Sequence, residues 1–176
     1  REKERLMITT KVIQSTFKKK LASLKKGDEV TVFGPMGTFV LDEKDPTPRV
    51  FIGGGIGITP FRSMLLSAAS SSSVMPITVL LAFSTVEEML FYQELHDATN
   101  KHDHIRVVYT ITQHDEAWQG ERGRISETLI KKYITDIHEH KYALVGPSAM
   151  VDTTKALLSS LNISEEKIMI EDFNGY

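Results

Sequence analysis

Short apolar runs alternate with amphipathic stretches from residue 49 to the end of the chain. Ile77–Phe83 is apolar except for Thr78, which is typical of a strand buried on both faces of a parallel sheet. Apolar residues at helical spacing in Pro60–Ala69 predict a helix. The same pattern predicts strands at 49–52, 77–83, 104–112, 142–145 and 167–170. It predicts helices at 60–69, 84–99, 126–137 and 146–161.

The first 41 residues have a different pattern, rich in β-forming residues. Residues 5–14 and 29–33 are predicted as strands, and 17–24 as a short amphipathic helix. A Gly34-Pro-Met-Gly37 turn then leads into a further apolar strand at about 38–41. Asp42–Arg49 holds two prolines and five charges, which makes it the best candidate for a linker.

Alternating strands and helices predict a parallel sheet covered by helices. Ligands of such sheets bind beyond the carboxyl ends of the strands. The predicted loops at that edge collect glycine, hydroxyl, arginine and aromatic residues, which favours a nucleotide site there. These loops are 53–60, 83–86, 112–124, 145–150 and 171–176.

The glycine-rich stretch that follows the first of these strands is the clearest candidate for a binding turn. Glycines allow positive φ angles and let backbone N–H groups approach a ligand closely. Thr59 is expected to cap the next helix and Pro60 to occupy its first position. The spacing Gly53-x-Gly55-x-Gly57 departs from the dinucleotide fingerprint because Ile58 replaces its third glycine. A phosphate-binding turn is favoured, and a tight turn without a ligand is the alternative.

Composition limits the classes of partner and location. The chain has 176 residues, 41% of them hydrophobic, and a net charge of −2, which argues against nucleic acid or an acidic membrane as the main partner. It has no apolar run long enough to span a membrane. The first residue is not Met, so we expect a piece of a longer chain.

The absence of cysteine excludes disulfides, thiolate metal sites and thiol catalysis by these residues. It is compatible with the reducing cytosol, and a cytoplasmic location is expected. His102, His104, His138 and His140 lack a third ligand at metal spacing, so we expect solvated histidines and no metal site.

Five motifs in order resemble the ferredoxin–NADP reductase-like flavoprotein family, in particular its cytochrome b5 reductase and bacterial oxygenase-reductase branches. They span nearly the whole chain: Gly34-Pro-Met-Gly37-x-Phe39, Gly53-Gly-Gly-x-Gly57-x-Thr59-Pro60, Gly123-Arg124, Gly146-Pro147 and Glu171-x-Phe173.

The resemblance implies an α/β fold in two parts. Residues 1–43 would be the C-terminal half of an antiparallel β-barrel that binds FAD, with FMN the less favoured flavin. Residues 47–176 would be a Rossmann-like parallel-sheet domain that binds NAD(P). The implied activity passes a hydride from NAD(P)H to the flavin, and then single electrons to a haem or iron–sulfur partner.

The resemblance also implies roles for single residues. Glu171, Phe173 and Thr59 are the expected catalytic residues, with the first two at the flavin ring. The expected cofactor-binding residues are Lys18, Gly34, Pro35, Gly37, Gly54, Gly55, Gly57, Thr59, Pro60, Ser84, Thr85, Arg122, Arg124, Gly146, Pro147 and Tyr176.

Three departures from the family pattern bear on these expectations. The first half of the flavin barrel and its Arg-x-Tyr-Ser/Thr motif are absent from this sequence. Ser15 replaces a glycine near the expected flavin pyrophosphate, and Val145 stands where the family often has cysteine. The alternative reading is a nucleotide-binding or regulatory module that does not retain flavin by itself.

Charge near the expected ribose favours NADH over NADPH. A 2′-phosphate usually requires arginine or lysine beside the ribose. The second strand is followed instead by Glu87 and Glu88, although Arg122 and Arg124 on a later loop could supply positive charge.

Overall fold

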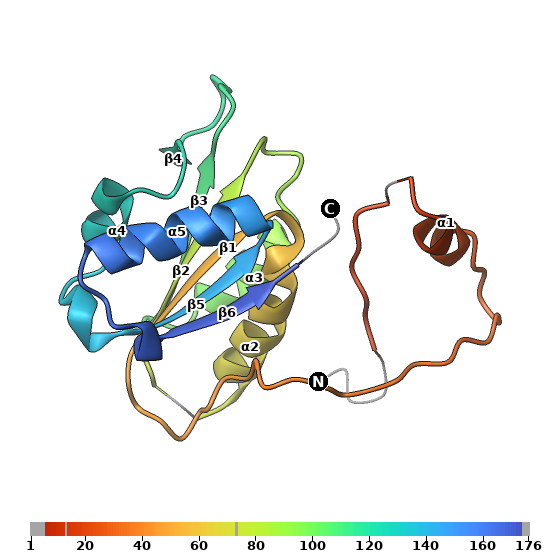
Figure 1. The fold of residues 1–176 in the computed structure, drawn as a ribbon, viewed down its shortest axis with the longest axis horizontal. Coiled ribbons are helices and arrows are strands. Elements are labelled where there is room, and N and C mark those ends of the chain that lie inside the picture. The colour runs from red at the N-terminus through yellow and green to blue at the C-terminus, as the bar shows by residue number, and fades with distance from the viewer. Residues whose placement is uncertain (1–5, 13, 73, 174–176) are drawn as a thin grey trace. The chain divides into compact units, whose positions relative to one another are not determined.

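The computed structural model describes residues 6–12, 14–72 and 74–173 (Figure 1). These residues divide into two compact units, with the boundary between Thr38 and Phe39. Each unit is described by itself.

The second unit is built on a six-stranded sheet in which every strand pair is parallel. The order of the strands across the sheet is β4-β3-β2-β1-β5-β6. The strands are β1 Arg49–Gly54, β2 Ile77–Phe83, β3 Ile105–Ile111, β4 Glu121–Arg122, β5 Lys141–Gly146 and β6 Ile168–Asp172.

Helices cover both faces of this sheet, so the fold is a three-layer α/β arrangement (Figure 1). The α-helices of the second unit are α2 Ile58–Ser70, α3 Tyr92–Thr99, α4 Glu127–Tyr133 and α5 Ser148–Ser160. Three short 3-10 helices are η1 Gly55–Gly57, η2 Ile137–Glu139 and η3 Glu165–Lys167.

The hydrophobic core lies in two layers because alternate residues of each strand face opposite sides of the sheet. Phe51 and the neighbouring odd-numbered strand residues pack under α2 and α3. The ring of Phe51 stacks on Phe61 of α2, with ring centres 4.7 Å apart. Ile52 and Leu80 face the other way, toward Ile130 of α4 and Leu158 of α5. We call these the α2 face and the α5 face.

The predicted parallel α/β fold is confirmed. The five predicted strands from residue 49 onward all form, with ends within two residues of the prediction. β4 was not predicted, because a strand of two residues is too short to show a hydrophobic periodicity. It pairs with β3 at Thr110 and Ile111.

The first unit contains α1, Thr16–Ala22, which overlaps the predicted helix at 17–24. Ser15 caps it by accepting a hydrogen bond from the Lys18 N–H at 3.4 Å. The strands predicted at 5–14, 29–33 and 38–41 are wrong for the described residues, which form no sheet ladder there. A strand needs a neighbour to satisfy its backbone groups and cover its apolar face. In the absence of one, Val30 and Phe33 are 62% and 84% exposed.

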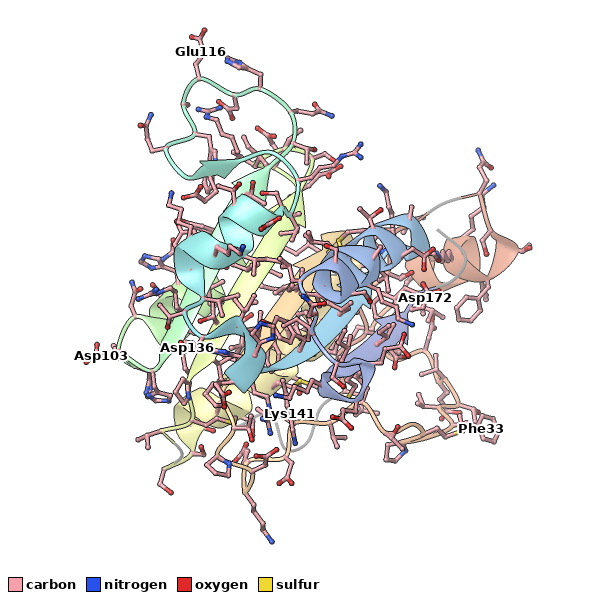
Figure 2. All side chains as sticks on the ribbon, turned by 60° about the vertical axis from the view of Figure 1, so that its left-hand side comes forward. Phe33, Asp103, Glu116, Asp136, Lys141 and Asp172 are labelled. Carbon is pink, nitrogen blue, oxygen red and sulfur yellow. The ribbon has the colours of Figure 1, made fainter. Side chains whose placement is uncertain are left out.

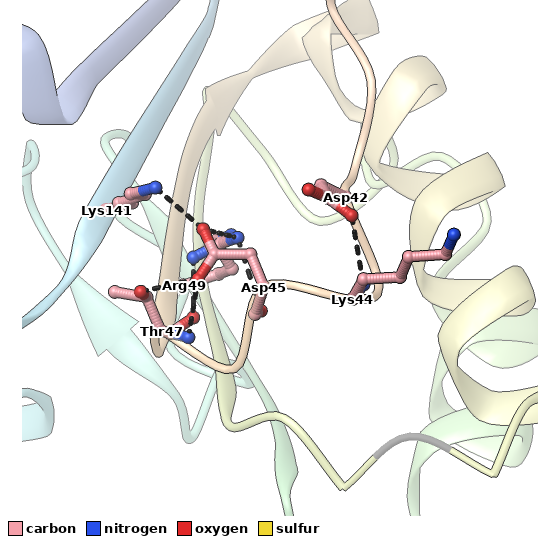
Figure 3. A network of polar contacts seen from close by, with 6 residues as sticks. All are labelled: Asp42, Lys44, Asp45, Thr47, Arg49 and Lys141. Atoms are coloured by element: carbon pink, nitrogen blue, oxygen red, sulfur yellow. Dashed lines mark hydrogen bonds and ion pairs between the residues drawn. The ribbon is translucent and has the colours of Figure 1, made fainter.

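Asp42–Arg49, predicted as a linker, lies within the second unit and is anchored to the sheet (Figure 3). The Asp45 carboxylate accepts hydrogen bonds from Arg49 at 2.7 Å and from Lys141 at 2.6 Å, which lie at the starts of β1 and β5. The Thr47 hydroxyl donates to the same carboxylate at 2.6 Å. We call this network the Asp45 clamp.

Candidate functional site

The strand order changes direction at β1. The chain runs outward from β1 through β2 and β3 to β4, and then crosses back to place β5 on the other side of β1. In open parallel sheets ligands bind beyond the carboxyl ends of the strands at such a switch point. The loops after β1 and β5 are the ones that the sequence marks with Gly53–Pro60 and Gly146-Pro147.

The glycine turn after β1 packs directly on the end of β5. A Cβ atom on Gly57 would lie 2.3 Å from the carbonyl oxygen of Val145, so this position has room for glycine alone. Gly55 differs, because its φ of +54° is left-handed and a Cβ there would have no atom within 4 Å. Gly57 therefore closes the turn onto β5, while Gly55 faces open space.

Gly54 and Gly146 bring the ends of β1 and β5 into close backbone contact. A Cβ on Gly146 would lie 3.3 Å from both the nitrogen and the oxygen of Gly54. The sulfur of Met150 fills the space beside Gly54, 2.5 Å from where its Cβ would stand. The two glycine loops thus form one continuous surface.

The N-terminus of α2 opens onto this surface without a side-chain cap or an acidic residue in its first turn. The prediction that Thr59 caps the helix is wrong, because α2 begins at Ile58 with Gly57 at the cap position. The Thr59 hydroxyl instead donates to the carbonyl of Ile56 at 2.9 Å. Pro60 is the third helical residue rather than the first, still within the turn where an N–H has no partner. The positive end of the helix dipole is left for an anion.

The start of α5 is arranged differently. Its cap residue, Pro147, offers no side-chain hydrogen bond. The hydroxyl of Ser148 donates to the carboxylate of Asp172 at 2.8 Å, which brings the end of β6 next to the start of the helix. Figure 2 shows Asp172 at the opposite end of the sheet from Lys141.

The end of β6 carries two of the predicted catalytic residues. Glu171 pairs in register with Val145 of β5. The Phe173 N–H donates to the carbonyl of Gly146 at 3.4 Å. Phe173 packs against the core of the α2 face, and by strand alternation exposed Glu171 lies on the same face. Tyr176, predicted to bind the cofactor, lies outside the described residues.

The predicted ribose region follows β2. Glu88 accepts a hydrogen bond from the Ser84 N–H at 3.3 Å. The Thr85 hydroxyl bonds to Glu87 and lowers the pKa of that carboxyl. The helix predicted to follow at once is wrong in its start, because α3 begins only at Tyr92. Phe91 has a left-handed φ of 59°, which breaks a helix before that point.

Arg122 and Arg124 are exposed at the far edge of the site. Arg122 donates to the carbonyl of Trp118 at 2.5 Å, and the indole N–H of Trp118 donates to the carbonyl of Glu121 at 2.8 Å. β4 is separated from β1 by β2 and β3, which corresponds to about 14 Å at the usual strand spacing. The structure therefore brings together the predicted residues of β1, β5 and β6, and leaves these two arginines at a distance.

The predicted flavin residues of the first part of the chain all lie in the first unit. Lys18 is half-buried in α1, whereas Gly34, Pro35 and Gly37 are exposed. Gly37 has a φ of +99°, which favours glycine. The apolar side chains around this turn, such as Phe33 and Met36 (both 84% exposed), form no enclosed pocket wall. The described residues of the first unit therefore do not fit a flavin on their own.

Sequence reasoning missed three participants. Ser148 and Asp172 lie inside motifs that the sequence marks, Gly-Pro-x and Glu-x-Phe, but the hydrogen bond between them was not predicted. Met150 fills the space beside Gly54, and no pattern signals it. His104, predicted to be solvated, is half-buried with Nε2 enclosed.

A cavity of about 270 Å³ lies at the opposite edge of the sheet, beside the Asp45 clamp. Its walls include Phe51, Ala143 and Met169. The described residues contain no group of three or more acidic, histidine or cysteine side chains arranged to hold a metal. Within the same residues, no helix has the length and apolar character needed to cross a membrane.

Comparison with known proteins agrees with this architecture. The family described as "Oxidoreductase NAD-binding domain" matches residues 51–156. One subunit of the Na(+)-translocating NADH-quinone reductase of Serratia proteamaculans is 30% identical over 159 residues, which cover 87% of this chain and 39% of that protein. The chain thus spans about two fifths of the length of the curated relatives it matches.

Solved structures share the fold. The cytochrome b5 reductase domain of Ulva prolifera nitrate reductase has a TM-score of 0.80 at 22% identity, with 89% of this chain and 64% of that chain covered. The CS-b5R domains of human Ncb5or, in their NAD+ form, have a TM-score of 0.77 at 22% identity, with 89% and 46% covered. The chain belongs to the oxidoreductase NAD-binding domain family, and its predicted resemblance to ferredoxin–NADP reductase-like proteins is confirmed.

Proposed function

We propose that this chain is the NADH-binding part of a flavin-dependent reductase. The nucleotide binds across the carboxyl ends of β1 and β5, with its pyrophosphate at the N-terminus of α2 and its nicotinamide beside Gly146 and Pro147. Glu171 and Phe173 lie beside that ring. A flavin, with FAD favoured, supplies the chemistry of accepting a hydride and releasing single electrons.

One observation carries this proposal. The glycine turn of η1 is packed so tightly on β5 that Gly57 cannot hold a side chain, while Gly55 and the uncapped start of α2 face outward. A turn needed only to join a strand to a helix does not require an uncapped helix without acidic residues in its first turn. This combination is what a pyrophosphate needs, because backbone N–H groups and a positive dipole end bind anions.

The end of β2 supports NADH over NADPH. The carboxylates of Glu87 and Glu88 fold back on Thr85 and Ser84, in the region proposed for the adenosine ribose. Two negative charges there favour a ribose hydroxyl and repel a 2′-phosphate. The quinone reductase relatives carry NADH in their names, which agrees with this choice.

The proposal extends to the class of the electron acceptor. We expect a one-electron acceptor such as a haem or iron–sulfur protein. One fold neighbour is a flavohemoglobin from Malassezia yamatoensis with bound FAD and haem. A cytoplasmic location stays a prediction.

A second candidate function is an NADH-binding module that does not retain a flavin by itself. The exposed apolar residues of the first unit favour it, because nothing in the described chain covers Val30, Val32 or Phe33. In this case the chain binds NADH and transfers no hydride.

The two functions are separated by the visible spectrum of the purified chain and by NADH added without oxygen. A yellow protein that bleaches supports the reductase, whereas a colourless protein that quenches or shifts NADH fluorescence supports the module. Failure to bind NADH at millimolar concentration would overturn both.

A further inference from the structure

We propose that Ser148 and Asp172 are a pair of positioning residues that hold the end of β6 against the nicotinamide side of the site. This inference rests on the proposed function. Neither residue is assigned there a direct contact with the nucleotide or the flavin. They act through their neighbours Pro147, Glu171 and Phe173.

The pair adds a side-chain link at the point where the ladder between β5 and β6 ends, with Gly146 and Asp172 in register. The Ser148 hydroxyl donates to the Asp172 carboxylate at 2.8 Å, whereas the backbone bond from Phe173 to Gly146 is 3.4 Å long. A hydrogen bond to a charged acceptor is stronger than one between neutral groups. The side-chain bond is therefore the stronger of these two links.

Strand geometry explains how a hydrogen bond on the α5 face fixes the direction of side chains on the α2 face. Asp172 lies between Glu171 and Phe173, and successive residues of a strand point to opposite faces. Asp172 therefore points to the α5 face, where Ser148 holds it, while its two neighbours point to the α2 face. Fixing Asp172 fixes the rotation of the strand end, and with it the direction of Glu171 and Phe173.

The position of Asp172 also suits the start of α5. This helix has no side-chain cap and no acidic residue of its own in its first turn. A carboxylate brought in from β6 is stabilised by the positive end of the helix dipole. The two helices that open on this edge are thus used differently: α5 receives a carboxylate of the protein, and α2 is left without one.

The consequence for binding is selective. Loss of the hydrogen bond between Ser148 and Asp172 lets Glu171 and Phe173 move beside the proposed nicotinamide position. It leaves the glycine turn and the start of α2 unchanged. The probe is ADP-ribose, which has the pyrophosphate and adenosine of NADH and lacks the nicotinamide. The ratio of the Kd of ADP-ribose to the Kd of NADH measures what the nicotinamide side contributes.

The test compares Ser148→Ala with wild type in binding titrations of both ligands. We expect the ratio to fall by about three- to tenfold, the range of one lost hydrogen bond, with the Kd of ADP-ribose unchanged. Ser148→Thr keeps a hydroxyl and is expected to restore the ratio. Ser160→Ala is the matched control, because its hydroxyl bonds to the Leu157 carbonyl at the other end of the same helix.

Hydrogen exchange of the Phe173 amide is the second readout, and we expect it to become faster in Ser148→Ala and to stay unchanged in Ser160→Ala. If both ligands bind wild type and neither the ratio nor the exchange rate changes, this inference is wrong and the proposed function stands. If neither ligand binds wild type, the proposed function is wrong and this inference is lost with it.

Discussion

The two edges of the parallel sheet treat their polar groups in opposite ways. At the amino edge the Asp45 clamp satisfies Arg49, Thr47 and Lys141 with one carboxylate, and the hydrogen bonds are 2.6–2.7 Å long. At the carboxyl edge the glycine turn and α2 have no side-chain cap. The amino edge is closed by the protein itself, and the carboxyl edge leaves donors for something else to bind.

This difference indicates which edge of such a sheet is the better candidate for a binding site. The cavity of about 270 Å³ lies at the amino edge, among charges that are already paired. At the carboxyl edge the uncapped start of α2 has unused hydrogen-bonding capacity. We therefore expect a ligand to bind at the unused donors, because a paired charge has already gained most of its interaction energy.

The largest effect is expected from Gly57→Ala. This substitution tests whether stability and NADH binding at the carboxyl edge depend on the close backbone contact between the glycine turn and β5. The new methyl group would meet the Val145 carbonyl at 2.3 Å, so the turn or β5 has to move. We expect a loss of about 1–3 kcal/mol in the free energy of unfolding. We also expect NADH affinity to fall more than tenfold. Urea unfolding and a fluorescence titration measure the two.

Gly55→Ala is the matched control for that substitution. Its methyl group meets nothing within 4 Å, so the cost comes from the left-handed φ of +54° alone, about 1–2 kcal/mol. Equal NADH affinity in Gly57→Ala and wild type would show that the packing on β5 has no part in binding.

The next effect concerns the amino edge. Asp45→Asn removes the negative charge on which Arg49 and Lys141 converge, and we expect a lower melting temperature at neutral pH with NADH affinity unchanged. The Lys141 and Thr47 hydrogen bonds, with that of Arg49, hold the pKa of Asp45 well below its ordinary value. The stabilisation is therefore present above the ordinary carboxyl pKa of about 4 and is lost as the pH falls below it.

Thermal unfolding of both proteins across the acid range checks this sign. The gap between wild type and Asp45→Asn should narrow as the pH falls. Lys141→Gln should have a smaller effect than Asp45→Asn, because Asp45 keeps Arg49 and Thr47. A gap that widens in acid would contradict the assignment of the clamp.

The smallest effect is expected from Glu87→Lys, which changes selectivity rather than stability. Replacing an acid by a base at the end of β2 should raise the affinity for NADPH relative to NADH by about tenfold. Glu139→Lys makes the same change of charge at the exposed amino edge and serves as the control. A selectivity shift of the same size in both variants would mean that the effect is one of net charge and not of the ribose site.

The second unit could be predicted largely from its hydrophobic pattern. Buried parallel strands such as β2 are almost entirely apolar, and their limits are visible where the apolar run ends. A helix predicted at 126–137 forms as α4, and the hydroxyl of its cap residue Ser126 accepts a hydrogen bond from the Leu129 N–H at 3.2 Å. A sequence pattern predicts a structural feature well where the residues involved are close neighbours in the sequence.

Other features depend on partners far away in the chain. The alternation of Glu29–Phe33 is a strand pattern, but a strand forms only where another strand pairs with it. Gly57 was expected to face a phosphate, whereas its missing side chain is explained by Val145, 88 residues later. The bond between Ser148 and Asp172 spans 24 residues, and no periodicity reports such a contact.

The shortness of β4 has a consequence for the behaviour of the protein in concentrated solution. β4 pairs with the last two residues of β3, so in the described part of the chain the first half of β3 borders no strand on that side. Open strand edges are templates for aggregation between chains, and a charged side chain is a common protection. Arg106 is exposed on this half of β3 and provides that charge. We therefore expect colloidal stability to depend on a residue far from the carboxyl edge of the sheet.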